Sequence, residues 1–294
     1  MPHLLITGAN GQVGQELRQL SDQFPAFQYT FADVVELDIT DAPGVADYFA
    51  NQQFDYCINC AAYTAVDKAE EQRELARRVN AMGPELLARA CAEQGTLMIQ
   101  LSTDYVYHNH QNHPFKEDDP THPQSVYART KLAGDLKVLQ NPRPGLVLRT
   151  SWVYSSFGHN FVKTMIRLGS ERDQLGIVFD QIGTPTYARD LALAILQIIE
   201  KREGGALPES AFSGVYHYSN EGVCSWYDFA LAIFELEKIN CTTHPIETKD
   251  YPTPASRPPF SVLNKNKIKA TFGLDIPHWR VALEQCLAAI KKSV

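Results

Sequence analysis

Tyr127 and Lys131 are the two residues whose types and spacing point most directly to chemistry. They stand four positions apart in the segment VYARTKLAG, so on a helix they would share one face. A phenol has a pKa of about 10, and a nearby ammonium lowers it by stabilising the phenolate. The pair therefore predicts a general acid that protonates a carbonyl oxygen as a hydride arrives. A surface tyrosine–lysine pair gives the same pattern, so the surrounding sequence must distinguish a catalytic pair from a surface pair.

Thr103 supplies part of that context. It follows a predicted strand in the segment LSTDYVY, about 24 residues before Tyr127. The carboxyl ends of parallel strands are where α/β sheets bind their ligands. We expect the Thr103 hydroxyl to hydrogen-bond a substrate oxygen and to hold it beside Tyr127.

A glycine-rich turn comes first along the chain. Gly8, Gly11 and Gly14 are spaced three apart in TGANGQVGQEL, directly after the first predicted strand. Glycine lets the backbone turn sharply and lets a pyrophosphate approach, while the following helix directs its N–H groups at that anion. Gln12 and Val13 would contribute backbone there. A flexible turn also explains three glycines, but the position after a strand favours dinucleotide binding.

Asp33 bears on the choice of cofactor. It stands 19 positions after Gly14, near where an acid would bind the adenosine ribose hydroxyls. The segment Tyr29–Thr40 contains no arginine or lysine to hold a 2′-phosphate. By charge alone NADH is acceptable, and the choice between NADH and NADPH stays open.

The elements that must position these residues alternate along the first half of the chain. Strands are predicted at His3–Thr7, Phe27–Phe31, Tyr56–Cys60, Leu97–Ser102 and Gly145–Thr150, and helices at Gln12–Leu20, Pro43–Asn51 (capped by Asp41), Glu70–Glu93 (kinked or divided at Pro84) and Val126–Leu139. Such an alternation predicts parallel β-α-β units with helices on both faces of the sheet. The expected fold class is α/β, with a Rossmann-type doubly wound parallel sheet.

The second half is less regular. Helices are predicted at Asn160–Leu168, Tyr187–Lys201, Trp226–Lys238 and His278–Lys291, a strand at Val215–Ser219, and an ordered loop at Tyr251–Pro259, which holds four prolines. We expect residues 1–150 to form an NAD(P)-binding domain. Residues 151–294 would mostly form a smaller substrate-binding cap, with segments about 185–202 and 214–220 returning to the first domain.

Composition excludes several classes of function. The net charge is −7, from 34 acidic and 27 basic residues, which argues against nucleic-acid binding. No apolar stretch reaches the ~20 residues of a membrane span, and no secretory signal precedes the first strand, so we expect a cytoplasmic protein without a membrane partner. Cys57 and Cys60 have C-x-x-C spacing, but no second pair completes a metal set. We expect no metal site and read the cysteines as buried thiols.

The motifs together carry a family resemblance. The G-x-x-G-x-x-G turn, the strand-end threonine and Y-x-x-x-K resemble the extended short-chain dehydrogenase/reductase superfamily. Further segments are similar to the dTDP-4-dehydrorhamnose reductase family in particular: AAYTAVDKAE (61–70), STDYVY (102–107), RTSWVY (149–154), GHNFVKTM (158–165), DQIGTPT (180–186) and YPTPASRPPFSVLN (251–264). The resemblance extends over nearly the whole chain.

That resemblance implies a reaction and a set of contacts. The reaction is reduction of the 4-keto group of dTDP-4-dehydro-β-L-rhamnose by NADH or NADPH, with Thr103, Tyr127 and Lys131 catalytic and Lys131 also holding the nicotinamide ribose. Further cofactor contacts are implied for Asp38, Ile39, Ala62, Tyr63 and Thr64, and sugar-nucleotide contacts for Thr103, Asp104, Tyr127, Trp152 and Arg257. Structural roles remain open for several of them: loop acid for Asp38, core residue for Ile39 and Trp152, helix cap for Thr64, and exposed cation for Arg257.

One departure from the family concerns assembly. The resemblance implies that some family members join two subunits through a magnesium ion held by glutamates. Glu16 matches one such position, but Arg189 stands where a second glutamate would be expected. A monomer or a homodimer with another interface is therefore expected.

Related activities are the main alternatives. The 4,6-dehydratases need an acid after the strand-end threonine and aspartate, where this chain has Tyr105. A 4-epimerase would return the hydride to its substrate, and another nucleotide-sugar 4-ketoreductase would differ only in substrate. From another class, the regulatory subunit of methionine adenosyltransferase resembles the same reductases without catalysing this reaction. The presence of Thr103, Tyr127 and Lys131 together disfavours a non-catalytic subunit.

Overall fold

A six-stranded parallel sheet forms the centre of the computed structural model, which describes residues 1–109, 111–143 and 145–292. Its strands are β1 (His3–Thr7), β2 (Gln28–Ala32), β3 (Tyr56–Asn59), β4 (Leu97–Thr103), β5 (Leu146–Thr150) and β10 (Gly214–His217), in the order β10-β5-β4-β3-β1-β2. All five pairings between neighbours are parallel. The inner strands are buried on both faces, as their continuous apolar sequences require.

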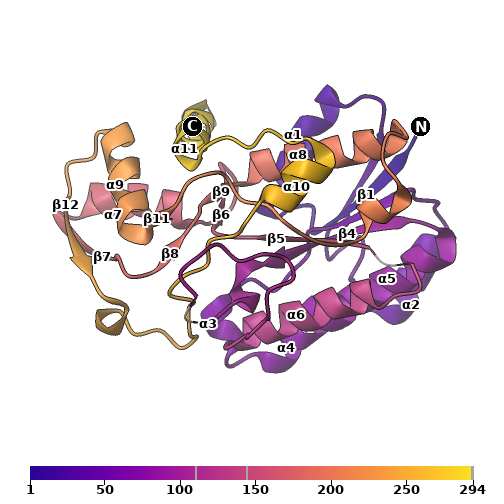
Figure 1. Cartoon of the computed structure of the whole chain (residues 1–294), viewed down its shortest axis with the longest axis horizontal. Coiled ribbons are helices and arrows are strands. Elements are labelled where there is room, and N and C mark those ends of the chain that lie inside the picture. Colours follow the sequence, from indigo (N-terminus) through magenta and orange to yellow (C-terminus); the bar gives the residue numbers. More distant parts are fainter. Residues whose placement is uncertain (110, 144, 293–294) are drawn as a thin grey trace.

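Helices cover both faces of this sheet (Figure 1). One face packs against α1 (Gln12–Leu20), α8 (Ala188–Glu203) and α10 (Asn266–Phe272). The other face packs against α2 (Ala42–Ala50), α5 (Gly83–Gln94) and α6 (Val126–Leu139). The predicted Rossmann-type doubly wound fold is confirmed.

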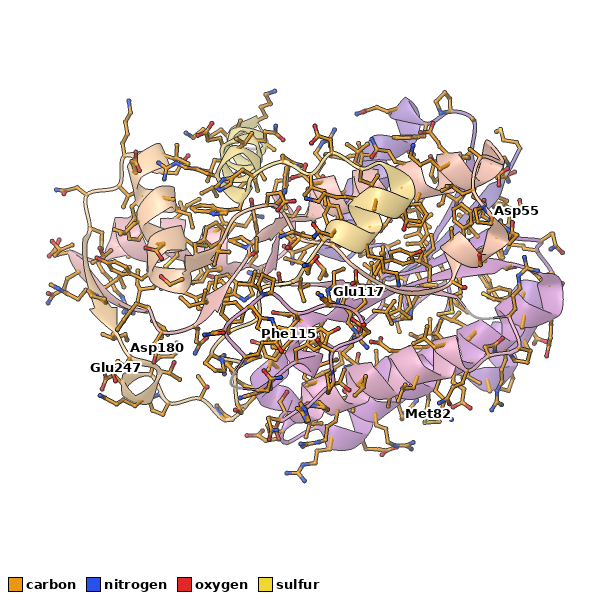
Figure 2. The ribbon with its side chains drawn as sticks, viewed as in Figure 1. Asp55, Met82, Phe115, Glu117, Asp180 and Glu247 are labelled. Carbon is orange, nitrogen blue, oxygen red and sulfur yellow. The ribbon has the colours of Figure 1, made fainter. Side chains whose placement is uncertain are left out.

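A smaller cap with its own apolar core lies to one side of the main sheet (Figure 1). It contains α7 (Phe161–Glu171), β7 (Gln174–Val178), α9 (Trp226–Glu237), β12 (Thr242–Ile246) and α11 (Trp279–Lys292). Two short strand pairs lie outside the main sheet: β6 (Val153–Tyr154) with β9 (Thr186–Tyr187), and β8 (Ile182–Gly183) with β11 (Cys224–Ser225). At its far end Asp180 and Glu247 lie together (Figure 2), and the Asp180 carboxylate accepts the N–H of Thr248.

The cap and the sheet are interleaved along the chain. α8 packs on α1, and β10 pairs with the outer edge of β5. Ile268 and Phe272 of α10 also enter the core beneath the sheet. The expected domain boundary at residue 150 remains a prediction. The last two residues of the predicted cap, 293–294, lie outside the described residues.

The predicted helix Glu70–Glu93 is helical from residue 73 onward, and a π-helical turn interrupts it just before Pro84, where a kink or division was expected. The segment holds α3 (Val66–Ala69), α4 (Arg73–Arg77), a π-helical turn η2 (Arg78–Met82) and α5. Pro84 lies in the first turn of α5, directly after this π-helical turn, and a proline inside a helix removes one backbone hydrogen bond. Asp41 precedes α2 as expected, but its side chain makes no capping hydrogen bond.

The irregular segments include elements that the sequence pattern did not predict. β7, β12 and α10 are short, and β12 contains Pro245, which disfavours a strand by composition. The remaining short helices are η1 (Ser21–Gln23), η3 (Asp104–Val106), η4 (Glu209–Phe212) and η5 (Thr248–Asp250). The proline-rich segment 251–259 contains neither helix nor strand, as predicted.

Candidate active site

Tyr127 and Lys131 lie on α6, whose bounds are those predicted. The helix begins at Ser125, whose hydroxyl accepts the N–H of Ala128. Lys131 is only 3% exposed, and its ammonium donates a 2.7 Å hydrogen bond to the Leu101 carbonyl of β4. The contact fixes the lysine against the strand that carries Thr103.

Thr103 ends β4 and meets Tyr127. Its hydroxyl and the Tyr127 phenol share a side-chain hydrogen bond. The same hydroxyl accepts the N–H of Tyr105 at 3.2 Å and lies 3.0 Å from Asp104 Oδ1. The Tyr105 ring stands edge-on to the Tyr127 ring, with centroids 5.6 Å apart. A strand end and a helix face therefore bring together the hydroxyls expected to act on a carbonyl.

The expectation that the pKa of Tyr127 is lowered is wrong in this structure. Burial raises the pKa of Tyr127 to about 12, and the carboxylates of Asp104 and Asp135 add to the rise. The Thr103 hydrogen bond partly opposes the rise, and the Lys131 ammonium binds the Leu101 carbonyl. The phenol therefore keeps its proton at neutral pH, which is the form a proton donor needs.

Asp104 is a buried acid beside these groups. It is 1% exposed, and burial raises its pKa to about 7, although hydrogen bonds from Ser261 and Thr103 partly oppose the rise. Among the described residues, Oδ2 of Asp104 has no hydrogen-bond partner within 3.5 Å. A polar atom of this kind, next to Thr103, is suited to receive a hydroxyl from a ligand.

The glycine turn joins β1 to α1. Gly8 has φ +62°, and a Cβ placed there would lie 2.5 Å from the backbone nitrogen of Ala61. Helix α1 begins after Gly11 with no side-chain cap and no acidic residue in its first turn. The first N–H groups of α1, at Gln12 and Val13, therefore lack a capping side chain. This arrangement suits an anion such as a pyrophosphate.

The three residues expected near the adenosine differ in environment. Asp33 follows β2, and its Oδ2 accepts the N–H of Asn10 at 2.8 Å, so it lies against the glycine turn. Asp38 is exposed, and its carboxylate accepts the N–H of Thr40. Ile39 is 5% exposed and belongs to the apolar core on the α5 side of the sheet. Asp33 is thus the acid placed nearest to the turn by a direct contact.

The segment after β3 carries Ala62, Tyr63 and Thr64. The Tyr63 N–H donates to Asn80 Oδ1 at 2.8 Å, and its phenol donates to Gln72. Thr64 is exposed, and α3 begins after Ala65 with no side-chain cap. The capping role considered for Thr64 is therefore wrong.

Trp152 lies in a strained conformation after β5. Its φ is +48°, which is unusual for a residue with a side chain. The indole stacks on Trp226 with centroids 3.5 Å apart, and a Cβ on Gly183 would lie 2.6 Å from its Cε2. Contacts with Trp226 and Gly183 hold the ring against the apolar core of the cap, and a role for Trp152 in sugar binding stays a prediction.

Arg257 is not a free cation. Its Nη2 lies 2.7 Å from Asp67 Oδ2, and its Nη1 donates to the Ala255 carbonyl. The pair ties the proline-rich segment to α3. A diphosphate at this position would have to compete with the Asp67 carboxylate.

Glu16 and Arg189 face each other across α1 and α8. Glu16 is 0% exposed, accepts a 2.6 Å hydrogen bond from Ser155 and lies 3.6 Å from the Arg189 guanidinium. Burial raises the pKa of Glu16, and Arg189 opposes the rise. The arginine that departs from the family pattern therefore lies against the glutamate that fits it.

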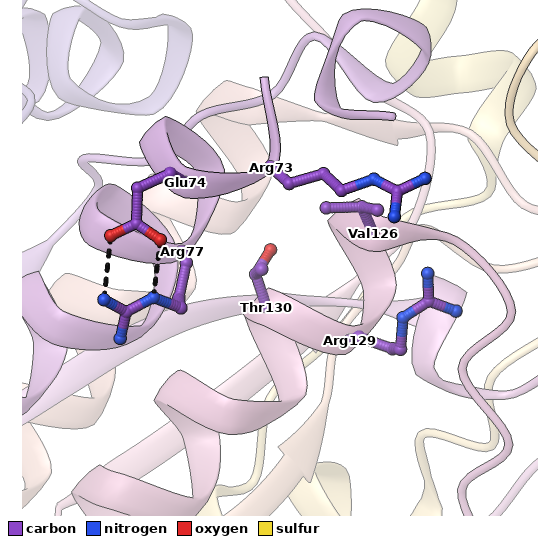
Figure 3. Close-up of a pocket in the computed structure, with 6 residues that line it drawn as sticks. All are labelled: Arg73, Glu74, Arg77, Val126, Arg129 and Thr130. Atoms are coloured by element: carbon purple, nitrogen blue, oxygen red, sulfur yellow. Dashed lines mark hydrogen bonds and ion pairs between the residues drawn. The ribbon is translucent and has the colours of Figure 1, made fainter. Parts of the chain in front are cut away.

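A cavity of about 250 Å³ lies on another face of α6 (Figure 3). Val126 and Thr130 line it, together with Arg73, Glu74, Arg77 and Arg129. Tyr127 and Lys131 are offset from Val126 and Thr130 by about 100° around the helix. Arg77 is paired with Glu74, so the cavity holds basic groups but neither of the residues expected to move protons.

The cysteines are free thiols, and Cys57 lies inside β3. Burial raises the pKa of Cys60, and Cys57 adds to the rise. Among residues 1–109, 111–143 and 145–292, no group of three or more histidine, cysteine or acidic side chains is arranged to hold a metal ion. Within the same ranges no helix is long and apolar enough to cross a membrane.

Sequence reasoning did not single out Asp135, which lies beside Lys131. Asp135 is 0% exposed and follows Lys131 by four positions on α6. The i to i+4 spacing that linked Tyr127 to Lys131 could have found it. An aspartate in the middle of a helix otherwise reads as a solvent-facing residue.

Comparisons with known proteins agree with this geometry. Residues 2–292 match the family model described as the RmlD substrate binding domain. The chain is 40% identical to a dTDP-4-dehydrorhamnose reductase of Aggregatibacter actinomycetemcomitans, over 98% of this chain and 99% of that protein. A solved dTDP-4-dehydrorhamnose reductase from Clostridium acetobutylicum has a TM-score of 0.92 and 40% identity, with 98% of this chain and 99% of that chain covered.

A second solved structure adds a ligand. It is a dTDP-4-dehydrorhamnose reductase from Bacillus anthracis in complex with NADP, with a TM-score of 0.92 and 35% identity over 98% of this chain and 100% of that chain. The matches extend over sheet and cap alike, so they do not rest on a shared nucleotide-binding half. This chain therefore belongs to the dTDP-4-dehydrorhamnose reductase family.

Proposed function

We propose that this chain reduces the 4-keto group of dTDP-4-dehydro-β-L-rhamnose to the hydroxyl of dTDP-β-L-rhamnose, with NADPH or NADH as reductant. Membership of the family supports the substrate and the reaction. The observation that carries the chemistry is the contact of a protonated Tyr127 phenol with Thr103, at the strand end, beside the buried Lys131.

The residues at the glycine turn fit a dinucleotide. The uncapped start of α1 offers N–H groups to a pyrophosphate, and Gly8 keeps the turn free of a side chain. When bound, a reduced nicotinamide supplies the hydride that forms the new C–H bond at C4. We assign cofactor contacts to Gly8, Gly11, Gln12, Val13, Asp33, Asp38, Ile39, Ala62, Tyr63, Thr64, Tyr127 and Lys131.

The proton that the carbonyl oxygen receives comes from a side chain of the protein. As C4 accepts a hydride, its carbonyl oxygen gains negative charge, and Tyr127 donates its phenolic proton to that oxygen. Thr103 orients the oxygen by a hydrogen bond, and the phenolate left on Tyr127 is stabilised by the nearby Lys131 until solvent returns a proton. We assign the sugar-nucleotide contacts to Thr103, Asp104, Tyr127, Trp152 and Arg257.

The position of Tyr105 separates this reaction from dehydration. Its phenol stands where a 4,6-dehydratase would need a carboxylic acid, and its ring packs on Tyr127. A reductase requires only the one donor already present. Monomer or homodimer assembly and a cytoplasmic location stay predictions, the first of which light scattering of the purified protein would decide.

Product analysis tests the proposed function. The purified chain is incubated with dTDP-4-dehydro-β-L-rhamnose and either NADPH or NADH, and both cofactor oxidation and product identity are followed. Stoichiometric oxidation with formation of dTDP-β-L-rhamnose is expected. An epimerase would give a changed sugar without net oxidation, and a non-catalytic subunit would give neither.

Replacement of Tyr127 tests the proposed acid. Tyr127→Phe should lower kcat by about 10²- to 10⁴-fold, because only the proton donor is removed, and cofactor affinity should stay nearly constant. Tyr216→Phe is the matched control, since this phenol lies on β10 and donates to the Ala211 carbonyl. Full turnover by Tyr127→Phe would contradict the assignment.

A further inference from the structure

Residues 251–258 form a loop, here called the proline-rich loop, whose two ends are held close together. Before it, the Thr248 hydroxyl donates a 2.6 Å hydrogen bond to the Asp180 carboxylate. After it, the Pro259 carbonyl accepts the N–H of Ile182 at 2.9 Å. Since Asp180 and Ile182 are two positions apart, both ends attach to the same short stretch of chain. Surface loops whose ends lie close together are frequently functional.

The tip of this loop reaches α3, the helix that follows β3. Three prolines, at positions 252, 254 and 258, leave the loop with few backbone donors. The N–H of Ala255 donates to Asp67 Oδ1 of α3 at 3.2 Å. Figure 1 shows the chain passing beside α3 before it continues to α10. The loop therefore connects the stretch around β8 with the half of the molecule that carries the glycine turn.

A bidentate ion pair holds the tip. Arg257 Nη2 lies 2.7 Å from Asp67 Oδ2, and Arg257 Nη1 lies 3.1 Å from Asp67 Oδ1. The Asp67 side chain is 39% exposed, so a ligand can reach the pair. Hydrogen bonds from Arg257 hold the pKa of Asp67 below its usual value, so the carboxylate stays charged at neutral pH. An anion with the same forked geometry can compete with it for the guanidinium.

The ion pair lies beside the groups that act on the sugar. Ser261, which follows the loop, donates a hydrogen bond to the buried Asp104 carboxylate. The charge of Arg257 also acts on the phenol of Tyr105, whose ring packs edge-on against Tyr127. One end of the loop therefore contacts an acid expected to bind the sugar, and its tip carries the cation expected to bind the diphosphate.

We propose that Asp67 competes with the substrate: it binds Arg257 and holds the proline-rich loop against α3 until the diphosphate of the sugar nucleotide takes Arg257 from it. The inference rests on the proposed function for the identity of the ligand. A diphosphate has more charge and more acceptor oxygens than a carboxylate, so the exchange favours the bound substrate. Because its prolines stiffen the loop, release of the tip moves the loop about its two fixed ends.

Binding of dTDP, measured by titration calorimetry without turnover, tests the competition. Asp67→Asn should tighten binding about threefold, because Arg257 loses a competing carboxylate, and Arg257→Gln should weaken it about tenfold or more. Arg257→Lys should fall between Arg257→Gln and the wild type, since it keeps the charge but not the fork. An ion pair that only stabilised the fold would shift binding in the same direction in the first two variants.

Two controls separate this competition from general electrostatics. Glu71→Gln removes the same charge from an exposed residue four positions after Asp67, and it should leave the affinity for dTDP nearly unchanged. Thymidine shares the base and the sugar of dTDP but has no phosphate. It should bind the wild type and Asp67→Asn equally.

Hydrogen exchange in ligand-free protein tests whether the ion pair holds the loop. The N–H of Ala255 is bound by Asp67, so it should exchange faster in both Asp67→Asn and Arg257→Gln than in the wild type. Equal exchange in all three proteins would show that other contacts hold the tip, and the proposed role of Asp67 would be overturned.

The outcomes separate this inference from the proposed function. If product analysis is positive but both variants weaken dTDP binding, or neither changes it, the competition is overturned and the proposed function stands. If product analysis is negative while dTDP binding shifts in opposite directions in the two variants, the proposed function fails and the competition stands. A wild-type protein that binds no dTDP would overturn both.

Discussion

At the scale of single residues, burial decides the acidity of the candidate acid. The expectation that Lys131 lowers the pKa of Tyr127 followed from spacing alone. Spacing placed both side chains on one helix face, but it could not show that the Leu101 carbonyl binds the ammonium or that the phenol is desolvated. The sequence spacing alone gives the helix face on which a side chain lies. How far the side chain is desolvated depends on which distant parts of the chain pack around it.

Asp104 should make stability fall as pH rises. Its folded pKa of about 7 lies above the 3.8 of the unfolded chain, so the folded state binds more protons between those values. Asp104→Asn removes this penalty while keeping an acceptor for Thr103. The free energy of unfolding should increase by up to about 4 kcal/mol at pH 8 and change little at pH 4. Urea denaturation at both pH values measures it, and an equal effect at both would count against a charged Asp104.

Asp33 should disfavour NADPH relative to NADH. Its carboxylate lies against the glycine turn, and a 2′-phosphate nearby would be repelled by about 1 kcal/mol for charges at ~4 Å in water. Asp33→Asn keeps the acceptor for the Asn10 N–H. The ratio of kcat/KM for NADPH to that for NADH should rise about fivefold or more.

The control for Asp33 is a remote acid. Asp22→Asn alters the net charge equally, on the exposed helix η1. It should leave the cofactor ratio unchanged. An unchanged ratio in Asp33→Asn as well would place the adenosine ribose elsewhere.

At the scale of elements, the turn between β1 and α1 depends on close approach. Gly8→Ala imposes a left-handed conformation on alanine and places a Cβ within 2.5 Å of the Ala61 nitrogen. Gly205 has a similar φ of +66° but nothing within 4 Å of an added Cβ. Gly205→Ala should therefore cost about 1–2 kcal/mol, and Gly8→Ala about 2 kcal/mol more.

Thermal and urea unfolding of the two alanine variants separate strain from clash. Equal losses of unfolding free energy in the two variants would show that the segment after β3 moves aside. In that case Gly8 would be required for its backbone conformation alone, and the packing of β3 against the turn would be looser than the contacts imply.

The main elements could be predicted because their signals are local. β1, α1 and α6 have the predicted bounds, since their apolar patterns lie within each segment. β7, β12 and α10 were missed because they gain stability from partners far along the chain. The same limit applies to the site: Tyr127, Lys131 and Thr103 carry a pattern, but the pairing of Arg257 with Asp67 does not.

At the scale of the whole molecule, the two halves complete each other. β5 is an inner strand only because β10 covers its outer edge, and α1 packs against α8 from the second half. Residues 1–150 alone would expose that edge and the apolar face beneath α1.

The fragment 1–150 should therefore not fold to a stable unit. We expect poor solubility, rapid proteolysis and no cooperative unfolding transition, while the full chain unfolds cooperatively under the same conditions. Circular dichroism and limited proteolysis of both would show this. A cooperatively folded fragment that binds NADPH would instead support an independent first domain.

The place of β10 and α10 in the chain order has a consequence for biosynthesis. During translation, the strands that form the cofactor half leave the ribosome well before residues 214–217 and 266–272, which complete it. The nascent polypeptide must keep an open sheet edge until β10 has emerged, and part of an apolar face uncovered until α10 has emerged. Premature termination in the cap would therefore abolish nucleotide binding as well as sugar recognition, so an incomplete product could not sequester cofactor.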